Sequence, residues 1–180
     1  AIGDHPYQFD FYDGGGLDMA FLGMAECNAK GDVNVSKFKD RIAGCGGFIN
    51  ITQNTHKVVF CGTFTAKGLR EEIRDGKLVI TREGAVQKFI DKVGQITFSA
   101  DYAHKHNQQV MFITERCVFV LTDKGLVLTE IAPGVDLQKD ILDQMEFVPH
   151  IAEDLKTMDE RIFRDEPMGL AQDIFEQKAS

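Results

Sequence analysis

Two glycine-rich stretches could do chemistry through the backbone alone, at residues 13–16 (Asp-Gly-Gly-Gly) and 43–47 (Ala-Gly-Cys-Gly-Gly). Glycine reaches positive φ and lets a ligand approach closely, so its N–H groups can bind an anion or an oxyanion that forms during a reaction. A tight turn without a ligand explains the same glycines. Neither stretch has the spacing of G-x-x-x-x-G-K-[ST] or G-x-G-x-x-G, so spacing leaves both interpretations open.

Three further features have side chains that could bind a metal, act as a nucleophile or contact a substrate. His104 and His106 are spaced like metal ligands, but no third ligand follows at a useful spacing and Lys105 lies between them, so we expect no metal site. Cys45 lies inside the second glycine-rich stretch without a histidine nearby in sequence, which favours a small buried side chain over a nucleophile. Glu26 follows a predicted strand, and is either a tolerated acid or a residue near a substrate.

The composition narrows the function classes. The 180 residues are 43% hydrophobic, which is ordinary for one globular domain. A net charge of −8 and a pI near 5.1 argue against a binder of nucleic acids or anionic membranes, although backbone amides and one or two lysines can still bind phosphate.

The cysteines and the N-terminus indicate a compartment. Four widely spaced cysteines without a C-x-x-C motif predict free thiols in a reducing cytoplasm. The chain has no apolar run approaching the roughly 20 residues that span a bilayer, and its first residues lack the features of a signal peptide. We therefore expect a cytoplasmic protein whose chain begins in the middle of a fold.

Apolar runs predict the elements that position these residues. Expected strands, including a late hairpin around residues 122–125, lie at 17–23, 57–64, 95–98, 110–114, 117–121 and 126–131. Expected helices lie at 137–145, capped by Asp136, and at 151–163, while 86–93 fits either a helix or an edge strand. The order predicts an α/β fold: a mixed open sheet with flanking helices, incomplete at its N-terminal side.

Several ordered motifs carry a family resemblance. Residues 9–26 (Phe-Asp-Phe-Tyr-Asp-Gly-Gly-Gly-Leu-Asp-Met-Ala-Phe-Leu-Gly-Met-Ala-Glu) resemble the β-half of the family I coenzyme A (CoA) transferases. Further matching segments follow at family-like spacing at 31–38, 44–50, 57–60, 65–68, 113–116 and 128–136, so that about four-fifths of the chain is covered. The chain is most similar to the single-chain acetate or propionate CoA-transferases.

The resemblance implies a reaction. These enzymes move CoA between a short-chain acyl-CoA and a carboxylic acid (acetate, propionate or acetoacetate type) through a glutamyl-CoA thioester. The family's glutamate lies in a Glu-Ser-Gly or Glu-Asn-Gly motif, which this chain lacks, and Glu71, Glu72 and Glu83 stand in the wrong context to replace it. Residues 1–180 are thus expected to be the C-terminal part of the β-half domain, inactive when alone.

The resemblance also assigns residues. Gly47, with Gly46 beside it, matches the family's oxyanion hole, and Glu115 matches a carboxylate near the catalytic glutamate. Positions that match the CoA channel or a CoA contact are Gly23, Ala43, Gly47 and Lys67. Two alternatives stay open: Lys67 as a solvated surface lysine, and Glu115 as a strand-end carboxylate paired with Arg116.

The expected partners follow from the same resemblance. CoA or acyl-CoA is a substrate, with no permanently bound cofactor and no metal. The other partners are a short-chain carboxylate, the missing N-terminal portion or α-half, and further copies of the chain in a homo-oligomer. The competing hypothesis is a non-catalytic fragment that binds CoA or a partner.

Overall fold

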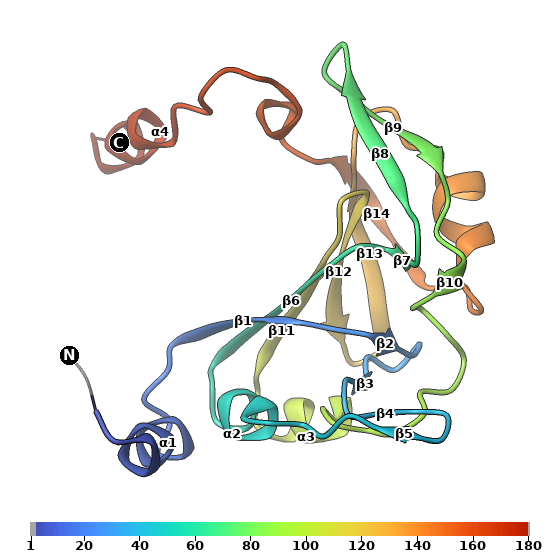
Figure 1. Ribbon diagram of the computed structural model, residues 1–180. Helices are drawn as coiled ribbons and strands as arrows, with labels where there is room; N and C mark the ends of the chain where they lie inside the picture. Colours follow the sequence, from blue (N-terminus) through green and yellow to red (C-terminus); the bar gives the residue numbers. More distant parts are fainter. Residues whose placement is uncertain (1–2, 180) are drawn as a thin grey trace.

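A six-stranded mixed sheet forms the centre of the structure, a computed structural model that describes residues 3–179 (Figure 1). Its strand order is β1-β6-β11-β12-β13-β14. The strands are β1 (Met19–Gly23), β6 (Lys57–Cys61), β11 (Gln109–Ile113), β12 (Cys117–Thr122), β13 (Gly125–Ile131) and β14 (His150–Thr157). β1, β6 and β11 are parallel, β12 and β13 form an antiparallel hairpin, and β14 is parallel to β13. The expected α/β class with a mixed sheet is confirmed. Residues 1, 2 and 180 of the expected domain lie outside the described residues.

Phenylalanines fill the main core on one face of this sheet. Phe60 of β6 and Phe112 of β11 are neighbours in the sheet, with ring centroids 5.2 Å apart. Phe60 also contacts Phe48 and Phe98, at centroid distances of 5.8 Å and 5.1 Å. Phe48 begins α2 (Phe48–Gln53) and Phe98 precedes α3 (Ala100–Lys105), so these contacts fix both helices against the amino ends of the parallel strands (Figure 1).

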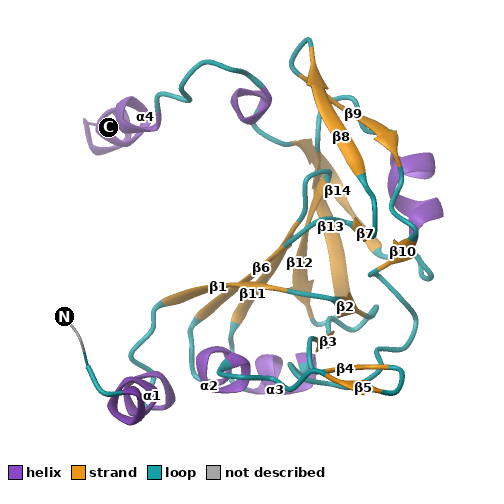
Figure 2. Ribbon diagram, in the orientation of Figure 1, coloured by secondary structure: helices purple, strands orange, loops and turns teal. Residues whose placement is uncertain are grey.

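A hairpin that the sequence patterns did not predict covers part of the other face. It consists of β8 (Arg70–Arg74) and β9 (Lys77–Arg82), and Figure 2 shows it standing beside β14. Its Leu78 joins a second, smaller core with Val118, Met158 and Phe163, the last from the 3₁₀ segment η3 (Glu160–Phe163). The Leu78 N–H also donates to the Pro133 carbonyl oxygen at 2.8 Å, so both hydrophobic contact and a backbone hydrogen bond attach this charged hairpin at β9.

Short elements complete the chain. The remaining α-helices are α1 (His5–Asp13) and α4 (Leu170–Ala179). The short strands are β2 (Glu26–Cys27), β3 (Val33–Asn34), β4 (Lys37–Phe38), β5 (Arg41–Ile42), β7 (Thr65–Ala66) and β10 (Val86–Gln87). Within the described residues, no helix is both long enough and apolar enough to cross a membrane.

Two predicted elements are wrong. Residues 151–163 do not form one helix: β14 occupies 150–157, because pairing with the free edge of β13 outweighs the helix-like spacing of Leu155, Met158 and Ile162. Residues 95–98 do not form a strand either. Only an isolated bridge joins Phe98 to Val33 there, although Phe98 is buried as expected of a strand residue.

Two other predictions are confirmed in modified form. Helical turns follow Asp136, whose side chain accepts a hydrogen bond from the Lys139 N–H at 2.8 Å, but they are a π-helix η1 (Leu137–Ile141) and a 3₁₀ turn η2 (Leu142–Gln144). The ambiguous segment 86–93 contains the short strand β10, paired with β7. The late hairpin is confirmed, with Thr122 opposite Gly125.

All four cysteines are free thiols, as expected, and their reactivity should differ. Burial raises the pKa of Cys27 and Cys117, and partial burial raises that of the exposed Cys61. Since only the thiolate reacts, we expect a disulfide reagent to label Cys61 before Cys27 and Cys117, faster as the pH rises. Peptide mass mapping of the labelled chain, with Cys61→Ser as control, checks this order. Labelling of Cys27 or Cys117 in the folded chain as fast as Cys61 would contradict it.

Candidate active site

The carboxyl ends of the three parallel strands meet at one edge of the sheet. Gly23, Cys61 and Ile113 are in register at the ends of β1, β6 and β11. The Gly62 N–H donates to the Ile113 carbonyl oxygen at 3.1 Å, which keeps the chain leaving β6 beside β11. Ligands of open α/β sheets bind in the crevice outside such strand ends. A ligand site is therefore expected at this edge.

Glu115 follows β11 at this edge and is held on both of its oxygens. One oxygen, Oε1, accepts from Arg116 Nε at 2.6 Å, and the other accepts from the Phe64 N–H at 2.8 Å. The pairing with Arg116, one of the two alternatives for this carboxylate, is therefore present. The second hydrogen bond adds a link to the segment after β6, which the sequence did not indicate.

Arg116 is fully buried and joins two carboxylates. Its guanidinium donates to Glu83 at 2.8 Å and 3.1 Å as well as to Glu115, and it also reaches the Asp140 carbonyl oxygen and lies 4.9 Å from the centre of the Phe64 ring. Burial opposes the charge, but hydrogen bonds to Glu83 and attraction to Glu115 outweigh it and raise the pKa of Arg116. Burial likewise acts against the Glu83 charge, yet the hydrogen bonds from Arg116 and Thr65 lower the pKa of Glu83.

Lys67 lies on a turn directly after β7. Its side chain is exposed, and its backbone has a positive φ of 59°, followed by a φ of 97° at Gly68. Its carbonyl oxygen accepts from the Ala85 N–H at 3.1 Å, and that of Gly68 accepts from Arg82 Nε at 2.6 Å. The backbone is thus fixed while the ammonium faces solvent, which is compatible with either interpretation of this lysine.

The second glycine-rich stretch forms the loop that leads into α2. The N–H groups of Ala43 and Gly44 both donate to the Ser36 carbonyl oxygen, so they are already used. Among the backbone hydrogen bonds of the described residues, none uses the N–H of Gly46 or Gly47. Gly46 has φ 51°, in the region that favours glycine, and a Cβ on Gly47 would lie 2.8 Å from Phe9 Cζ, so a larger side chain at position 47 would displace the Phe9 ring.

A buried lysine, Lys88, stands at the same edge and was missed by sequence reasoning. It is 6% exposed, and its ammonium donates to the Thr63 carbonyl oxygen at 2.7 Å. Burial lowers its pKa. A Cβ on Gly62 would lie 3.0 Å from Lys88 Nζ, so glycine makes room for this ammonium.

A cavity of about 290 Å³ lies between the residue after Gly23 and the residue before Lys67. Its lining includes Ala66, which precedes Lys67, and Met24, which follows Gly23, together with Ala25, Glu26, Phe38, Val86, Gln87 and Lys88. Glu26 is held in its wall, since its Oε2 accepts from Asn34 Nδ2 at 2.6 Å and from the Gly94 N–H at 2.9 Å. The cavity thus brings the surroundings of Gly23 and Lys67 together.

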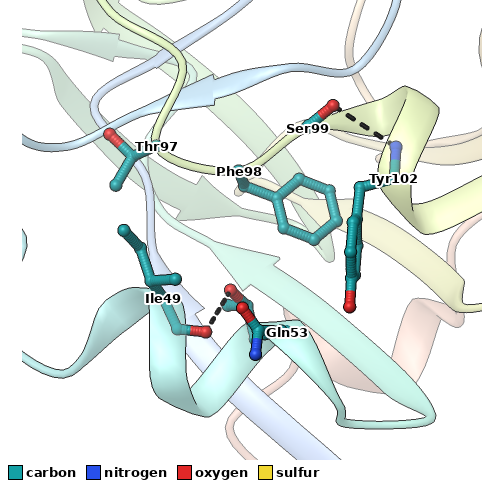
Figure 3. Close-up of a pocket in the computed structure, with 7 residues that line it drawn as sticks. Ile49, Gln53, Thr97, Phe98, Ser99 and Tyr102 are labelled. Atoms are coloured by element: carbon teal, nitrogen blue, oxygen red, sulfur yellow. Dashed lines mark hydrogen bonds between the residues drawn. The ribbon is translucent and has the colours of Figure 1, made fainter.

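Two further cavities have linings different from this one. Figure 3 shows one of about 160 Å³ between α2 and α3, where Ile49, Phe98 and Tyr102 surround a space that no candidate residue lines. A larger cavity of about 520 Å³ adjoins Glu115 on the sheet face covered by β8 and η3. In the part of the chain that the structure describes, no group of three or more His, Cys, Asp or Glu side chains is placed to hold a metal ion.

Comparison with known proteins finds CoA-transferases as relatives of this chain. No family model matches the chain. The caffeate CoA-transferase of Acetobacterium woodii is 53% identical over 172 residues, which are 93% of this chain and 33% of that protein. The acetate CoA-transferase YdiF of Escherichia coli K12 is 55% identical over 169 residues, 94% of this chain and 32% of that protein. The chain is therefore similar, at more than half of the aligned positions, to about one third of these CoA-transferases.

Solved structures agree with this family. The apoenzyme of the acyl-CoA transferase YdiF from Escherichia coli O157:H7 superposes with a TM-score of 0.92 at 55% identity, over 94% of this chain and 33% of that one. The decarboxylase AibA/AibB, at 20% identity and a TM-score of 0.64, shares the fold alone. The resemblance seen in the sequence motifs is thereby confirmed, and the chain spans about a third of the length of the CoA-transferases it matches.

Proposed function

We propose that this chain supplies one third of a CoA-transferase that moves CoA between a short-chain acyl-CoA and a carboxylic acid. The observation that carries the proposal is the 55% identity to an acetate CoA-transferase over 94% of the chain. A structure of the Escherichia coli O157:H7 relative is described as a thioester complex with CoA. CoA would then be a substrate of this protein too, with no permanently bound cofactor.

The proposed reaction divides between this chain and the remainder of a full-length enzyme. A glutamate carboxylate outside this chain attacks the thioester carbonyl carbon, the thiolate of CoA leaves, and a mixed anhydride forms. The thiolate then attacks the glutamyl carbonyl carbon, which gives a glutamyl-CoA thioester and frees the first carboxylic acid. The acceptor acid reverses these steps.

We assign the free amides of Gly46 and Gly47 to the oxyanion that each addition creates, because donors that are already fixed and unpaired stabilise such charge best. Gly23, Ala43 and Lys67 would line the path of CoA, with the Lys67 ammonium near its phosphates. Glu115 would lie near the catalytic glutamate. Its two hydrogen bonds, from Arg116 and Phe64, would fix its orientation there.

A donor–acceptor panel on the full-length protein tests the proposed function. Acetyl-, propionyl- and acetoacetyl-CoA should each be tried against acetate and propionate, with ping-pong kinetics as the expected result. Borohydride should trap a thioester on a glutamate outside this chain, and the chain alone should show no turnover. Activity without a trappable thioester would sink the mechanism. CoA binding without any turnover would support the non-catalytic alternative, which no observation favours.

We also propose, from the family resemblance, that residues 1–180 form part of one β-half domain. The same resemblance suggests that the protein works as a cytoplasmic homo-oligomer. Its acyl groups would belong to short-chain fatty acid or ketone-body metabolism. The two relatives described above are named for different acids, caffeate and acetate, so the panel must include an aromatic acid. Sedimentation of the full-length protein tests the oligomer, and a monomer with full activity would contradict it.

Lys67→Ala is expected to raise KM for acyl-CoA about tenfold while kcat changes little. A hydrogen bond to a charged group contributes about 1.5 kcal/mol or more, and a phosphate far from the reacting carbon is bound equally in ground and transition states. Steady-state kinetics on the full-length protein measure the split. Lys124→Ala, at the exposed turn between β12 and β13, is the control. Equal KM values for Lys67→Ala and the wild type would favour the solvated-lysine interpretation.

A further inference from the structure

The segment from Gly62 to Gly68, which carries Lys67, is fixed by hydrogen bonds along most of its length. Its first half is held from three sides: the Gly62 N–H donates to Ile113, the Thr63 carbonyl oxygen accepts from Lys88, and the Phe64 N–H donates to Glu115. These partners come from β11, from the residues after β10 and from the residues after β11. The segment is therefore anchored to the carboxyl edge of the sheet before it reaches Lys67.

Residues 82–85 hold the second half. Glu83 is hydrogen-bonded to Thr65 Oγ1, which also accepts from the Gly84 N–H at 3.1 Å. The Ala85 N–H donates to the Lys67 carbonyl oxygen at 3.1 Å, and Arg82 reaches Gly68. A Cβ on Gly84 would lie 2.5 Å from the Ala66 carbonyl oxygen, so only glycine at position 84 lets its backbone lie this close to that of Ala66.

Arg116 links the two halves. It binds Glu115, which holds Phe64, and Glu83, which holds Thr65, and its guanidinium lies over the Phe64 ring. Buried ion pairs contribute little net stability compared with apolar residues of the same size. Net stability therefore does not explain why ion pairs link Glu83, Arg116 and Glu115. Both carboxylates hold the segment from Gly62 to Gly68, and fixing this segment does explain the arrangement.

That segment ends in an unusual backbone conformation. Lys67, with φ 59°, is not glycine, and side chains in this region cost roughly 1–3 kcal/mol unless the surroundings impose the geometry. Such conformations are concentrated at ligand-binding sites, where they aim a side chain. We propose that Glu83 and Arg116 are positioning residues for Lys67: they hold the backbone of its turn in one conformation, so that only the side chain has to order when the ammonium meets an anionic group of CoA. The proposal rests on the proposed function, because CoA is the ligand.

A double-mutant cycle on the full-length protein tests this role. Glu83→Gln is expected to weaken CoA binding about fivefold to tenfold, measured by calorimetry, and to leave it nearly unchanged when Lys67 is already alanine. Residues that act only on overall stability would instead give losses that multiply in the double variant. Glu72→Gln is the matched control, because Glu72 is exposed on β8 and pairs with Arg74. Arg116→Lys serves as the second variant and is expected to couple to Lys67 in the same way.

Hydrogen exchange gives a readout that does not depend on CoA. In Glu83→Gln the Ala85 amide, which donates to Lys67, is expected to exchange at least tenfold faster than in the Glu72→Gln control, while amides of β6 keep their protection. Unchanged exchange at Ala85, or multiplying losses in the cycle, would overturn the positioning role. A folded full-length protein that binds no CoA would overturn the proposed function and this inference together, whereas binding with independent losses would overturn this inference alone.

Discussion

Arg116→Met is expected to lower the free energy of unfolding by about 3–5 kcal/mol, because removing one partner of a buried ion pair leaves uncompensated charge behind. Here two carboxylates, Glu83 and Glu115, would lose their common partner, and the Asp140 carbonyl oxygen would lose a donor. Methionine has a similar length, so the cavity it leaves is small and the charge effect dominates.

Urea denaturation followed by circular dichroism measures this loss. Arg74→Met is the matched control: Arg74 pairs with Glu72 on the exposed hairpin, and such surface pairs contribute about 1 kcal/mol or less. If both variants lost the same stability, the ion pairs of Arg116 would not stabilise the edge of the sheet.

The pH dependence of the unfolding free energy should also reflect the Glu83–Arg116 pair. Because the folded-state pKa of Glu83 is lowered, its stabilisation is present above the unfolded-state pKa and disappears as the pH falls through the folded-state value.

Phe60→Ala is expected to cost about 3–5 kcal/mol, the range for a fully buried phenylalanine. Its ring contacts Phe48, Phe98 and Phe112, so one cavity would loosen α2, the segment before α3 and the middle of the sheet at once. Thermal and urea unfolding check the value. Val148→Ala, at a side chain 79% exposed, should change stability by less than about 0.5 kcal/mol. A loss below about 1 kcal/mol for Phe60→Ala would contradict the proposed centre of the core.

The sequence predicts the parts of the fold whose pattern is local. The runs at β1, β6, β11 and the β12–β13 hairpin are apolar and bounded by turn residues, and all are strands in the structure. β14 could not be recognised, because whether Ile151 and its neighbours form a strand depends on the free edge of β13 and not on their own spacing. The β8–β9 hairpin lacks an apolar face on β8, yet its turn carries a signal that could have found it: Asp75-Gly76, both with positive φ.

The candidate site, like the fold, could be predicted only in part from the sequence. Gly23, Lys67 and Glu115 were found through matched motifs, and the structure brings their surroundings to one edge of the sheet. Lys88 and Glu83 look like ordinary surface charges in the sequence. Only the tertiary structure shows that one is buried beside Thr63 and that the other binds Arg116.

The parallel pairing of β1, β6 and β11 has a consequence for folding kinetics. Each of these pairings closes a long loop. The hydrogen bonds of the candidate site also join residues far apart in the sequence: Phe64 and Glu115 are 51 positions apart, and Glu83 and Arg116 are 33 apart. Because the entropy of such closures is lost before the contacts compensate for it, high contact order slows folding. The Lys67 turn is held mainly through such long-range bonds and should acquire protection only after β6 and β11 have paired, so the candidate-site edge of the sheet would be among the last parts of the domain to form.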